Sequence, residues 1–142
     1  MLTNRRPIRI EWGDCDPAGI VFYPRYFMML DACTAHLLER GTGLNKSQLI
    51  QAHKFAGFPM VDARVRFIIP LRFGDDVTIE SSITMVGTSS FEVRHAILKG
   101  DTLAVEGQEV RVWVGRDPSD PATMKAQPIP PVVADVMRGA SA

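Results

Sequence analysis

Hydrophobic residues recur at helical spacing between about Gly19 and Gly43. They lie three, four and seven residues apart, which places one hydrophobic stripe along a helix. Pro24 favours the first turn of a helix, so we expect a short turn near residues 18–22 and the main helix from about Pro24. Gly41 and Gly43 indicate where this helix ends. The stripe comprises Tyr23, Tyr26, Phe27, Leu30, Thr34, Leu37, Leu38 and Gly41.

Other stretches show the period of two that is typical of strands. In Val77–Val86, hydrophobic residues alternate with threonine, serine and glutamate, which predicts an antiparallel strand with one buried face. Ile8, Ile10 and Trp12 alternate with polar residues, so residues 8–12 predict a short strand with these three side chains on one face. Lys99-Gly100-Asp101 predicts a hairpin turn. The remaining predicted strands are Met60–Ile69, Phe91–Leu98 and Leu103–Gly115.

The rest of the chain adds little regular structure. Ser47–Phe55 predicts a second, shorter helix. The tail from about Arg116 holds five of the ten prolines, so we expect it to be partly irregular, with a short helix at Val132–Arg138. Residues 1–142 are enough to bury one core, and we predict a single domain.

The order of these elements is a strand, a long helix and then several antiparallel strands. A helix with one hydrophobic stripe is best buried against a sheet, which predicts an α+β fold with the antiparallel sheet wrapped around the central helix. Such a sheet leaves an edge and a second face uncovered. We therefore expect a homo-oligomer.

Composition and charge narrow the possible functions. The chain has 16 basic and 16 acidic residues, so its formal net charge is zero. Proteins that bind nucleic acids or membrane surfaces usually have an excess of basic residues, so we expect neither kind of partner. The basic residues near the start precede no apolar segment, and no stretch approaches the roughly 18 apolar residues of a membrane span. Cys15 and Cys33 form no CxxC pair, which predicts free thiols in the cytoplasm.

Several catalytic chemistries lack their sequence patterns. His36, His53 and His95 are scattered without metal-ligand spacing, so we expect no metal site. No GxSxG, GxGxxG or P-loop pattern is present, and we expect no cofactor. Cys15 is flanked by two aspartates, which should raise its pKa and make it a poor nucleophile.

Asp14 and Asp16 stand directly before the aromatic start of the predicted helix. Asp16 followed by Pro17 fits a helix N-cap, and Asp14 can close the turn with its own side chain. The alternative is a catalytic carboxylate. A helix start offers free N–H groups and a positive dipole end, which can hold an oxyanion beside an ionised nucleophile or base. Both interpretations fit the pattern.

The run Trp12–Pro24, W-G-D-C-D-P-A-G-I-V-F-Y-P, closely resembles the signature of hotdog-fold acyl-CoA thioesterases of the 4-hydroxybenzoyl-CoA thioesterase type. Weaker similarity continues through Leu30-Asp31-Ala32, Gly57-x-Pro59, Phe73–Asp76 and Ser90–His95, up to about residue 115. The resemblance implies the hotdog fold, in which a sheet wraps a long helix. It also implies hydrolysis of an acyl-CoA to a carboxylic acid and CoA, without metal or redox cofactor.

The resemblance also implies roles for individual residues. Asp16 would act on the thioester carbonyl as nucleophile or general base, and the Tyr23 backbone N–H would polarise that carbonyl. Asp31 would lie near the acyl pocket and contact a substrate hydroxyl, or serve only as a polar residue at a subunit boundary. The family's active sites form between subunits, which implies a dimer and commonly a dimer of dimers, so a homotetramer.

Two positions depart from the family pattern. Gly87-Thr88-Ser89 carries no charge where the 4-hydroxybenzoyl enzyme has a basic turn that helps to hold the CoA phosphates. Phe58 stands in place of a small polar residue at the acyl pocket. We therefore expect other cations to hold the phosphates, and the candidates are Arg64, Arg66, Arg72, Arg94 and Lys125. Each of these arginines also fits an ordinary solvated strand face.

An aromatic acyl group such as hydroxybenzoyl is the leading substrate, because the helix face is rich in aromatic residues. A second hypothesis is a hotdog protein that binds acyl-CoA or acyl carrier protein without hydrolysis, which the uncharged turn keeps open. A dehydratase-like hotdog enzyme ranks last, since that chemistry pairs a histidine with an acidic residue near the helix and the opening stretch has no histidine.

Overall fold

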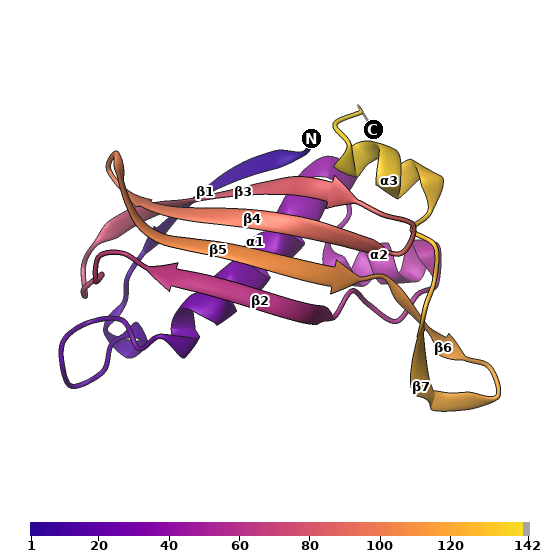
Figure 1. Ribbon diagram of the computed structural model, residues 1–142, viewed down its shortest axis with the longest axis horizontal. Helices are drawn as coiled ribbons and strands as arrows, with labels where there is room; N and C mark the ends of the chain where they lie inside the picture. Colours follow the sequence, from indigo (N-terminus) through magenta and orange to yellow (C-terminus); the bar gives the residue numbers. More distant parts are fainter. Residues whose placement is uncertain (141–142) are drawn as a thin grey trace.

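The computed structural model describes residues 1–140 (Figure 1). They form a five-stranded sheet, a two-stranded hairpin, three α-helices and one turn of 3-10 helix, η1 (Trp12–Asp14). The helices are α1 (Pro24–Thr42), α2 (Lys46–His53) and α3 (Pro131–Met137). The strands are β1 (Thr3–Arg9), β2 (Met60–Phe67), β3 (Asp76–Val86), β4 (Ser90–Lys99), β5 (Thr102–Val112), β6 (Val114–Asp117) and β7 (Asp120–Ala126).

The main sheet has the strand order β1-β3-β4-β5-β2, and every neighbouring pair is antiparallel. α1 crosses one face of this sheet along its length, while α2 and α3 lie toward one end (Figure 1). The predicted fold, an antiparallel sheet around one long helix, is confirmed. β1 and β2 are the two edges of the sheet.

The limits of α1 follow from its sequence. Pro24 occupies the first turn, where its missing N–H costs nothing. The helix ends at Gly43, which takes a φ of 75° and donates its N–H to the Glu39 carbonyl at 2.8 Å. Five members of the predicted stripe, Tyr26, Leu30, Thr34, Leu37 and Leu38, are buried. Phe27 and Gly41 are half-buried, and Tyr23, which precedes the first turn, is 58% exposed.

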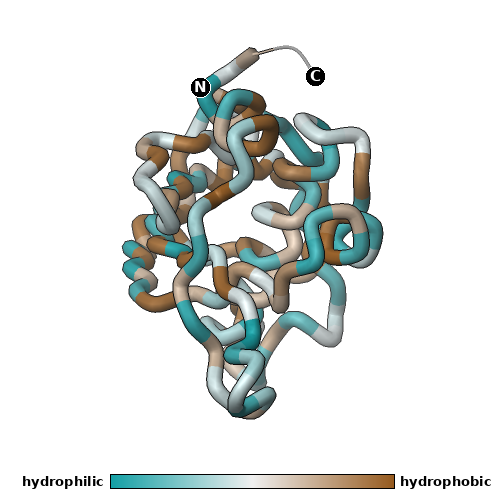
Figure 2. The backbone as a smooth tube through the Cα atoms, turned by 90° about the vertical axis from the view of Figure 1, so that its right-hand side faces the viewer, coloured by the Kyte–Doolittle hydropathy of each residue, from teal (hydrophilic) through white to brown (hydrophobic). Residues whose placement is uncertain are grey.

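Hydrophobic and hydrophilic residues alternate along much of the chain (Figure 2). In the strands this alternation builds two hydrophobic clusters under the sheet. One cluster includes Leu37, Ile83 and Val93, and the other includes Leu30, Ile79 and Ile97. Between these positions, the same inward faces carry buried polar side chains. We call them the polar layer: Thr34, Ser81, His95, Glu109 and Arg111.

The predicted position of the first strand, residues 8–12, is wrong, because the strand lies earlier in the chain. β1 ends at Arg9, and Trp12 lies in η1 with 75% of its surface exposed. Ile10 is fully buried, as expected, but the chain turns immediately after it. The Trp12 ring packs edge-on against Phe73, with ring centroids 5.6 Å apart, and does not enter the core.

The tail is more regular than predicted. β6 and β7 pair as an antiparallel hairpin that projects from the main sheet (Figure 1). The predicted short helix is present as α3, and the Leu2 N–H donates to the Met137 carbonyl at 2.9 Å. None of the helices within residues 1–140 is long and apolar enough to cross a membrane.

Gly107 on β5 lets α1 approach the sheet closely. A Cβ at this position would lie 2.6 Å from Leu30 Cδ1, well inside van der Waals contact. Leu30 is itself buried in the helix–sheet interface and has little room to move. The glycine therefore fixes the distance between helix and sheet at this point.

We expect Gly107→Ala to lower the free energy of unfolding by about 1–3 kcal/mol, because the added methyl group overpacks the interface. In a Leu30→Ala background the same change should cost less, since the clashing Cδ1 is gone. Urea unfolding of the two single variants and the double variant measures this coupling. Gly13→Ala is the matched control, because a Cβ there meets no atom within 4 Å. Additive effects of the two substitutions would contradict the proposed contact.

Candidate active site

Asp14 holds the loop that precedes α1. Its Oδ2 accepts the Glu11 N–H at 2.9 Å, and its Oδ1 accepts the Arg25 Nε–H at 3.1 Å. Its carbonyl also accepts the Phe22 N–H at 2.8 Å, which closes the loop. Asp14 is buried, so these contacts tie both ends of the loop to the helix start. The prediction that Asp14 belongs to the turn agrees with this geometry.

Asp16 does not cap α1, which begins eight residues later; that interpretation of Asp16-Pro17 is wrong. It closes an isolated turn instead. Its Oδ1 accepts the Ala18 N–H at 2.9 Å, and its carbonyl accepts the Gly19 N–H at 2.9 Å. Gly19 takes a φ of 83°, which glycine adopts without strain. Within residues 1–140, Asp16 Oδ2 accepts no hydrogen bond, so one carboxylate oxygen stays free.

Tyr23 is the N-cap of α1, and no side chain caps this helix. Among the described residues the Tyr23 N–H has no hydrogen-bond acceptor, and Pro24 has no N–H to offer. The next amides, of Arg25 and Tyr26, donate to the Phe22 and Tyr23 carbonyls. The Tyr23 N–H is therefore a free donor at the positive end of a 19-residue helix.

Two cavities flank this loop. One, of about 430 Å³, is lined by Trp12, Cys15, Asp16, Pro17 and Gly19. The other, of about 220 Å³, is mostly apolar and begins where the loop ends, at Ile20 and Val21. Its other lining residues are Tyr23, Tyr26 and the segment Phe67–Pro70. The loop thus separates a carboxylate-bearing cavity from an aromatic one.

Aromatic rings form the wall of the apolar cavity. Phe67 lies edge-on to Tyr23 with centroids 6.4 Å apart, and tilted against Tyr26 at 5.6 Å. Burial raises the pKa of the Tyr26 hydroxyl, so this group is neutral. A flat apolar group fits such a wall better than a charged one.

Asp31 and Phe58 are brought together by a residue that the sequence did not single out, Arg111. The Arg111 guanidinium donates to Asp31 Oδ1 at 2.7 Å and to the Phe58 carbonyl at 3.3 Å. The Phe58 ring is buried in the core against Phe55 and Phe91. The Phe58 carbonyl accepts from Arg111, and the Arg111 Cζ lies over the Phe58 ring, 5.8 Å from the centroid.

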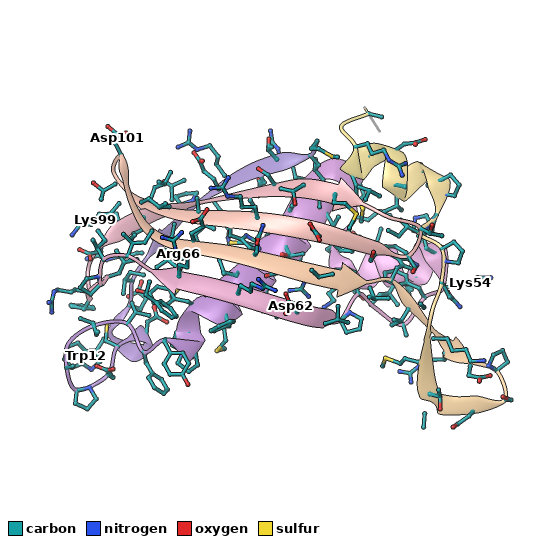
Figure 3. All side chains as sticks on the ribbon, viewed as in Figure 1. Trp12, Lys54, Asp62, Arg66, Lys99 and Asp101 are labelled. Atoms are coloured by element: carbon teal, nitrogen blue, oxygen red, sulfur yellow. The ribbon has the colours of Figure 1, made fainter. Side chains whose placement is uncertain are left out.

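Three of the predicted arginines lie on the outer face of the sheet, away from the Asp16 loop. Arg64 and Arg66 are on β2, and Arg94 is on β4. Figure 3 shows Arg66 and Asp62 on β2, and Trp12 on the loop before α1. Each arginine has an acidic partner: Arg64 pairs with Asp62 at 3.4 Å, and both Arg66 and Arg94 pair with Glu106.

The other two predicted cations lie in different places. Arg72 forms an isolated β-bridge with Ile20, and its Nη1 lies 3.8 Å from the position that a Cβ would take at Gly19. It is therefore the predicted cation that the fold brings to the Asp16 loop. Lys125 is on β7 and pairs with Asp117 at 3.1 Å.

The polar layer was not predicted as a unit. His95 Nε2 lies 3.1 Å from Glu109 Oε1, His95 Nδ1 lies 2.7 Å from Ser81 Oγ, and the Thr34 hydroxyl donates to Glu109 Oε2 at 2.9 Å. Burial alone would raise the pKa of Glu109, but hydrogen bonds from His95 and Arg111 outweigh it and lower this pKa. Burial likewise works against the charge of Arg111, but the hydrogen bonds to Glu109 and Asp31 raise its pKa above the usual value.

His95 and Glu109 form the kind of acid–histidine pair that a dehydratase-like enzyme would need. His95 is completely buried, however, and Glu109 is only 3% exposed. A substrate cannot reach this pair. Within residues 1–140, no group of three or more His, Cys, Asp or Glu side chains is placed to share a metal ion.

The sheet wrapped around α1 and the loop before it define a hotdog-fold protein. A family model described as Thioesterase-like superfamily matches residues 10–137. The 4-hydroxybenzoyl-CoA thioesterase of Pseudomonas sp. (strain CBS-3) is 33% identical over 114 residues, covering 77% of this chain and 81% of that protein.

Solved structures agree. A gentisyl-coenzyme A thioesterase superposes with a TM-score of 0.81 at 34% identity, over 96% of this chain and 100% of that one. A 4-hydroxybenzoyl CoA thioesterase variant complexed with 4-hydroxybenzoyl CoA superposes with a TM-score of 0.87 at 27% identity, over 96% and 99%. The chain belongs to the thioesterase-like superfamily. The predicted family and the predicted class of thioester hydrolase are confirmed.

The two aspartates of the loop should affect stability differently. We expect Asp14→Ala to lower the free energy of unfolding by about 1–3 kcal/mol, because it removes the acceptor of the Glu11 N–H and of the Arg25 guanidinium. Asp16→Asn keeps the Oδ1 acceptor of its turn and should change this free energy by no more than about 0.5 kcal/mol. Chemical denaturation of both variants measures the difference. Equal destabilisation would contradict the assignment of Asp14 to the loop's structure and of Asp16 to the cavity.

Proposed function

We propose that this protein hydrolyses the thioester of an aromatic acyl-CoA and releases the carboxylic acid and free CoA. The observation that carries the proposal is the single loop that presents Asp16 to one cavity and leads into the aromatic cavity at the start of α1. Membership of the thioesterase-like superfamily supports the reaction class. The similar proteins named as 4-hydroxybenzoyl-CoA and gentisyl-coenzyme A thioesterases support an aromatic acyl group.

Asp16 acts on the thioester carbonyl through its free Oδ2. As a nucleophile it forms a new C–O bond while the C–S bond breaks and CoA leaves as a thiolate; water then hydrolyses the mixed anhydride. As a general base it takes a proton from the attacking water. In either case the carbonyl oxygen becomes negative, and the Tyr23 N–H at the positive end of α1 binds it.

The acyl group lies against the aromatic wall of the apolar cavity, where Tyr23, Tyr26 and Phe67 exclude water. Asp31 contacts a hydroxyl on this group, and the segment around Phe58 borders it. For the phosphates of CoA, Arg64, Arg66 and Arg94 offer a cluster of exposed guanidinium groups on one sheet face. Among the predicted phosphate-binding cations, Arg72 is the one that lies beside the Asp16 loop. The two free thiols, Cys15 and Cys33, fit a cytoplasmic location.

The site is completed between subunits. In one chain, Asp16 and the helix start occupy one region, while Asp31 and the sheet arginines occupy others. The edge strand β2 exposes Val61 and Phe67, and the nearby helix start exposes Tyr23 and Met28. An unpaired sheet edge with exposed apolar side chains favours pairing with a second copy. We expect a homodimer joined at this edge, with two dimers forming a homotetramer.

We expect Asp16→Asn and Asp16→Ala to lower kcat for hydrolysis of a hydroxybenzoyl-CoA by about 10²–10⁴-fold, because either change removes the nucleophile or base. Release of free thiol from a panel of aroyl- and fatty acyl-CoA substrates measures the activity. Asp101→Asn in the β4–β5 turn is the matched control and should keep full activity. An active Asp16→Asn variant would show that the carboxylate serves only the turn. A wild-type protein that binds these thioesters without hydrolysing them would be the non-hydrolytic hotdog protein.

We expect Val61→Lys to dissociate the subunits and to remove hydrolysis in parallel. Val61 is 61% exposed on the edge strand, and a lysine there places like charges opposite each other if two edges pair. Analytical ultracentrifugation and the thiol assay on the same samples test both effects. Val132→Lys, an equally exposed valine on α3, is the control. A monomer with full activity would contradict a site built between subunits.

A further inference from the structure

Arg111 is a buried cation with three separate acceptors. Only 3% of its side chain is exposed. Nε donates to Glu109 Oε2 at 2.7 Å, Nη1 to the Phe58 carbonyl at 3.3 Å and Nη2 to Asp31 Oδ1 at 2.7 Å. These acceptors belong to β5, to the segment before β2 and to α1. The planar guanidinium therefore fixes three parts of the fold relative to one another.

Asp31 is the exposed end of this arrangement. Its side chain is 54% exposed, and an aspartate so exposed on a helix normally rotates freely. Here Oδ1 is held by a short charge-assisted bond to Arg111. Within residues 1–140, Oδ2 accepts no hydrogen bond. One carboxylate oxygen is thus held in a fixed position and left open to a donor from outside the chain.

Glu109 holds Arg111 from the buried side, and the rest of the polar layer holds Glu109. An ionised Glu109 can only accept hydrogen bonds, so His95 Nε2 carries a proton toward it. Ser81 then bonds the other ring nitrogen, and Thr34 donates to the second oxygen of Glu109. No buried side-chain N or O atom of the described residues lacks a partner. Arg111 consequently has one orientation.

Such a layer contributes little to stability compared with a hydrophobic one. Buried ion pairs are often matched or exceeded in stability by apolar side chains of similar volume, because both charges must be desolvated. The layer also interrupts two hydrophobic clusters that would otherwise be continuous. Its effect on the surface is specific, however: it fixes the Asp31 carboxylate and the Phe58 carbonyl.

We infer that Arg111, held by Glu109 and His95, is a positioning residue for selection of the acyl group. It aims Asp31 Oδ2 at a hydrogen-bond donor, such as a ring hydroxyl, on the acyl group, and it fixes the Phe58 segment beside it. The inference rests on the proposed function, because the ligand is the acyl group of the hydrolysed thioester. It predicts that selectivity between hydroxylated and unsubstituted acyl groups depends on Arg111, which does not contact the acyl group.

The test compares kcat/KM for 4-hydroxybenzoyl-CoA with kcat/KM for benzoyl-CoA. The wild-type protein should prefer the hydroxylated substrate. Arg111→Lys keeps the charge but has one nitrogen in place of the three that each serve a different acceptor. It should reduce the ratio by about tenfold, mainly through KM of the hydroxylated substrate. Asp31→Asn should reduce the ratio similarly. The double variant should lose no more than either single variant, because both act on the same contact.

Val133→Ala is the matched control outside the polar layer. It removes buried side-chain volume in α3 but belongs neither to the polar layer nor to the contacts among Asp31, Arg111 and Phe58, so it should lower the Tm and leave the selectivity ratio unchanged. Equal losses on both substrates in Arg111→Lys, or a ratio that follows Tm across all variants, would show a purely structural role. A wild-type protein without preference between the two substrates would overturn the inference as well.

Two further measurements cover the remaining outcomes. If Arg111→Lys fails to fold, Asp31→Glu moves the carboxylate by one methylene and keeps its charge; an unchanged ratio would then contradict positioning. If the wild-type protein hydrolyses neither substrate, the proposed function fails on its own. Calorimetry then measures the Kd of each thioester, and the ratio of the two Kd values replaces the ratio of kcat/KM. Each variant should change this ratio as described above.

Discussion

The packing of α1 against the concave face of the sheet is the interaction on which the rest of the structure depends. It buries the stripe from Tyr26 to Leu38, and Gly107 lets the helix approach the strands closely. The same packing fixes where the helix starts, and so where the free Tyr23 N–H lies. A helix that shifted along the sheet would move this donor and the loop before it together. The hydrophobic core thereby sets the geometry of the site.

The helix face is not uniformly hydrophobic, and this matters for function. Thr34 interrupts the stripe at the point where Ser81, His95 and Glu109 interrupt the strands. Each polar side chain there is desolvated, so each must be bonded, and together they admit one arrangement. A core built only from leucine and valine could support the helix equally well. It could not hold an arginine in one orientation beneath a surface carboxylate.

Much of the fold follows from local pattern, whereas the site depends on contacts between distant residues. The helix from Pro24 to Gly43 and the strand at Val77–Val86 were predicted because their periodicity is strong and unbroken. Trp12 was misplaced because alternation alone cannot show where a strand ends, and the Asp16 turn was mistaken for a helix start because Asx turns and N-caps use the same residues. Ser81 and His95 occupy inward positions of their strands, a signal that could have marked them as buried. Their pairing with Glu109 and Arg111 depends on strand register, which one sequence does not reveal.

The two aspartates of the loop illustrate how a carboxylate is made available for chemistry. Asp14 uses both oxygens and its carbonyl to hold the chain, so nothing remains for a substrate. Asp16 uses one oxygen for its turn and keeps the other free at a cavity. Asp31 repeats this arrangement on the helix, with Arg111 in place of the turn. In each case one fixed oxygen orients the other. A carboxylate with one bound oxygen loses little further entropy when it meets a ligand, and this is the physical advantage that both residues share.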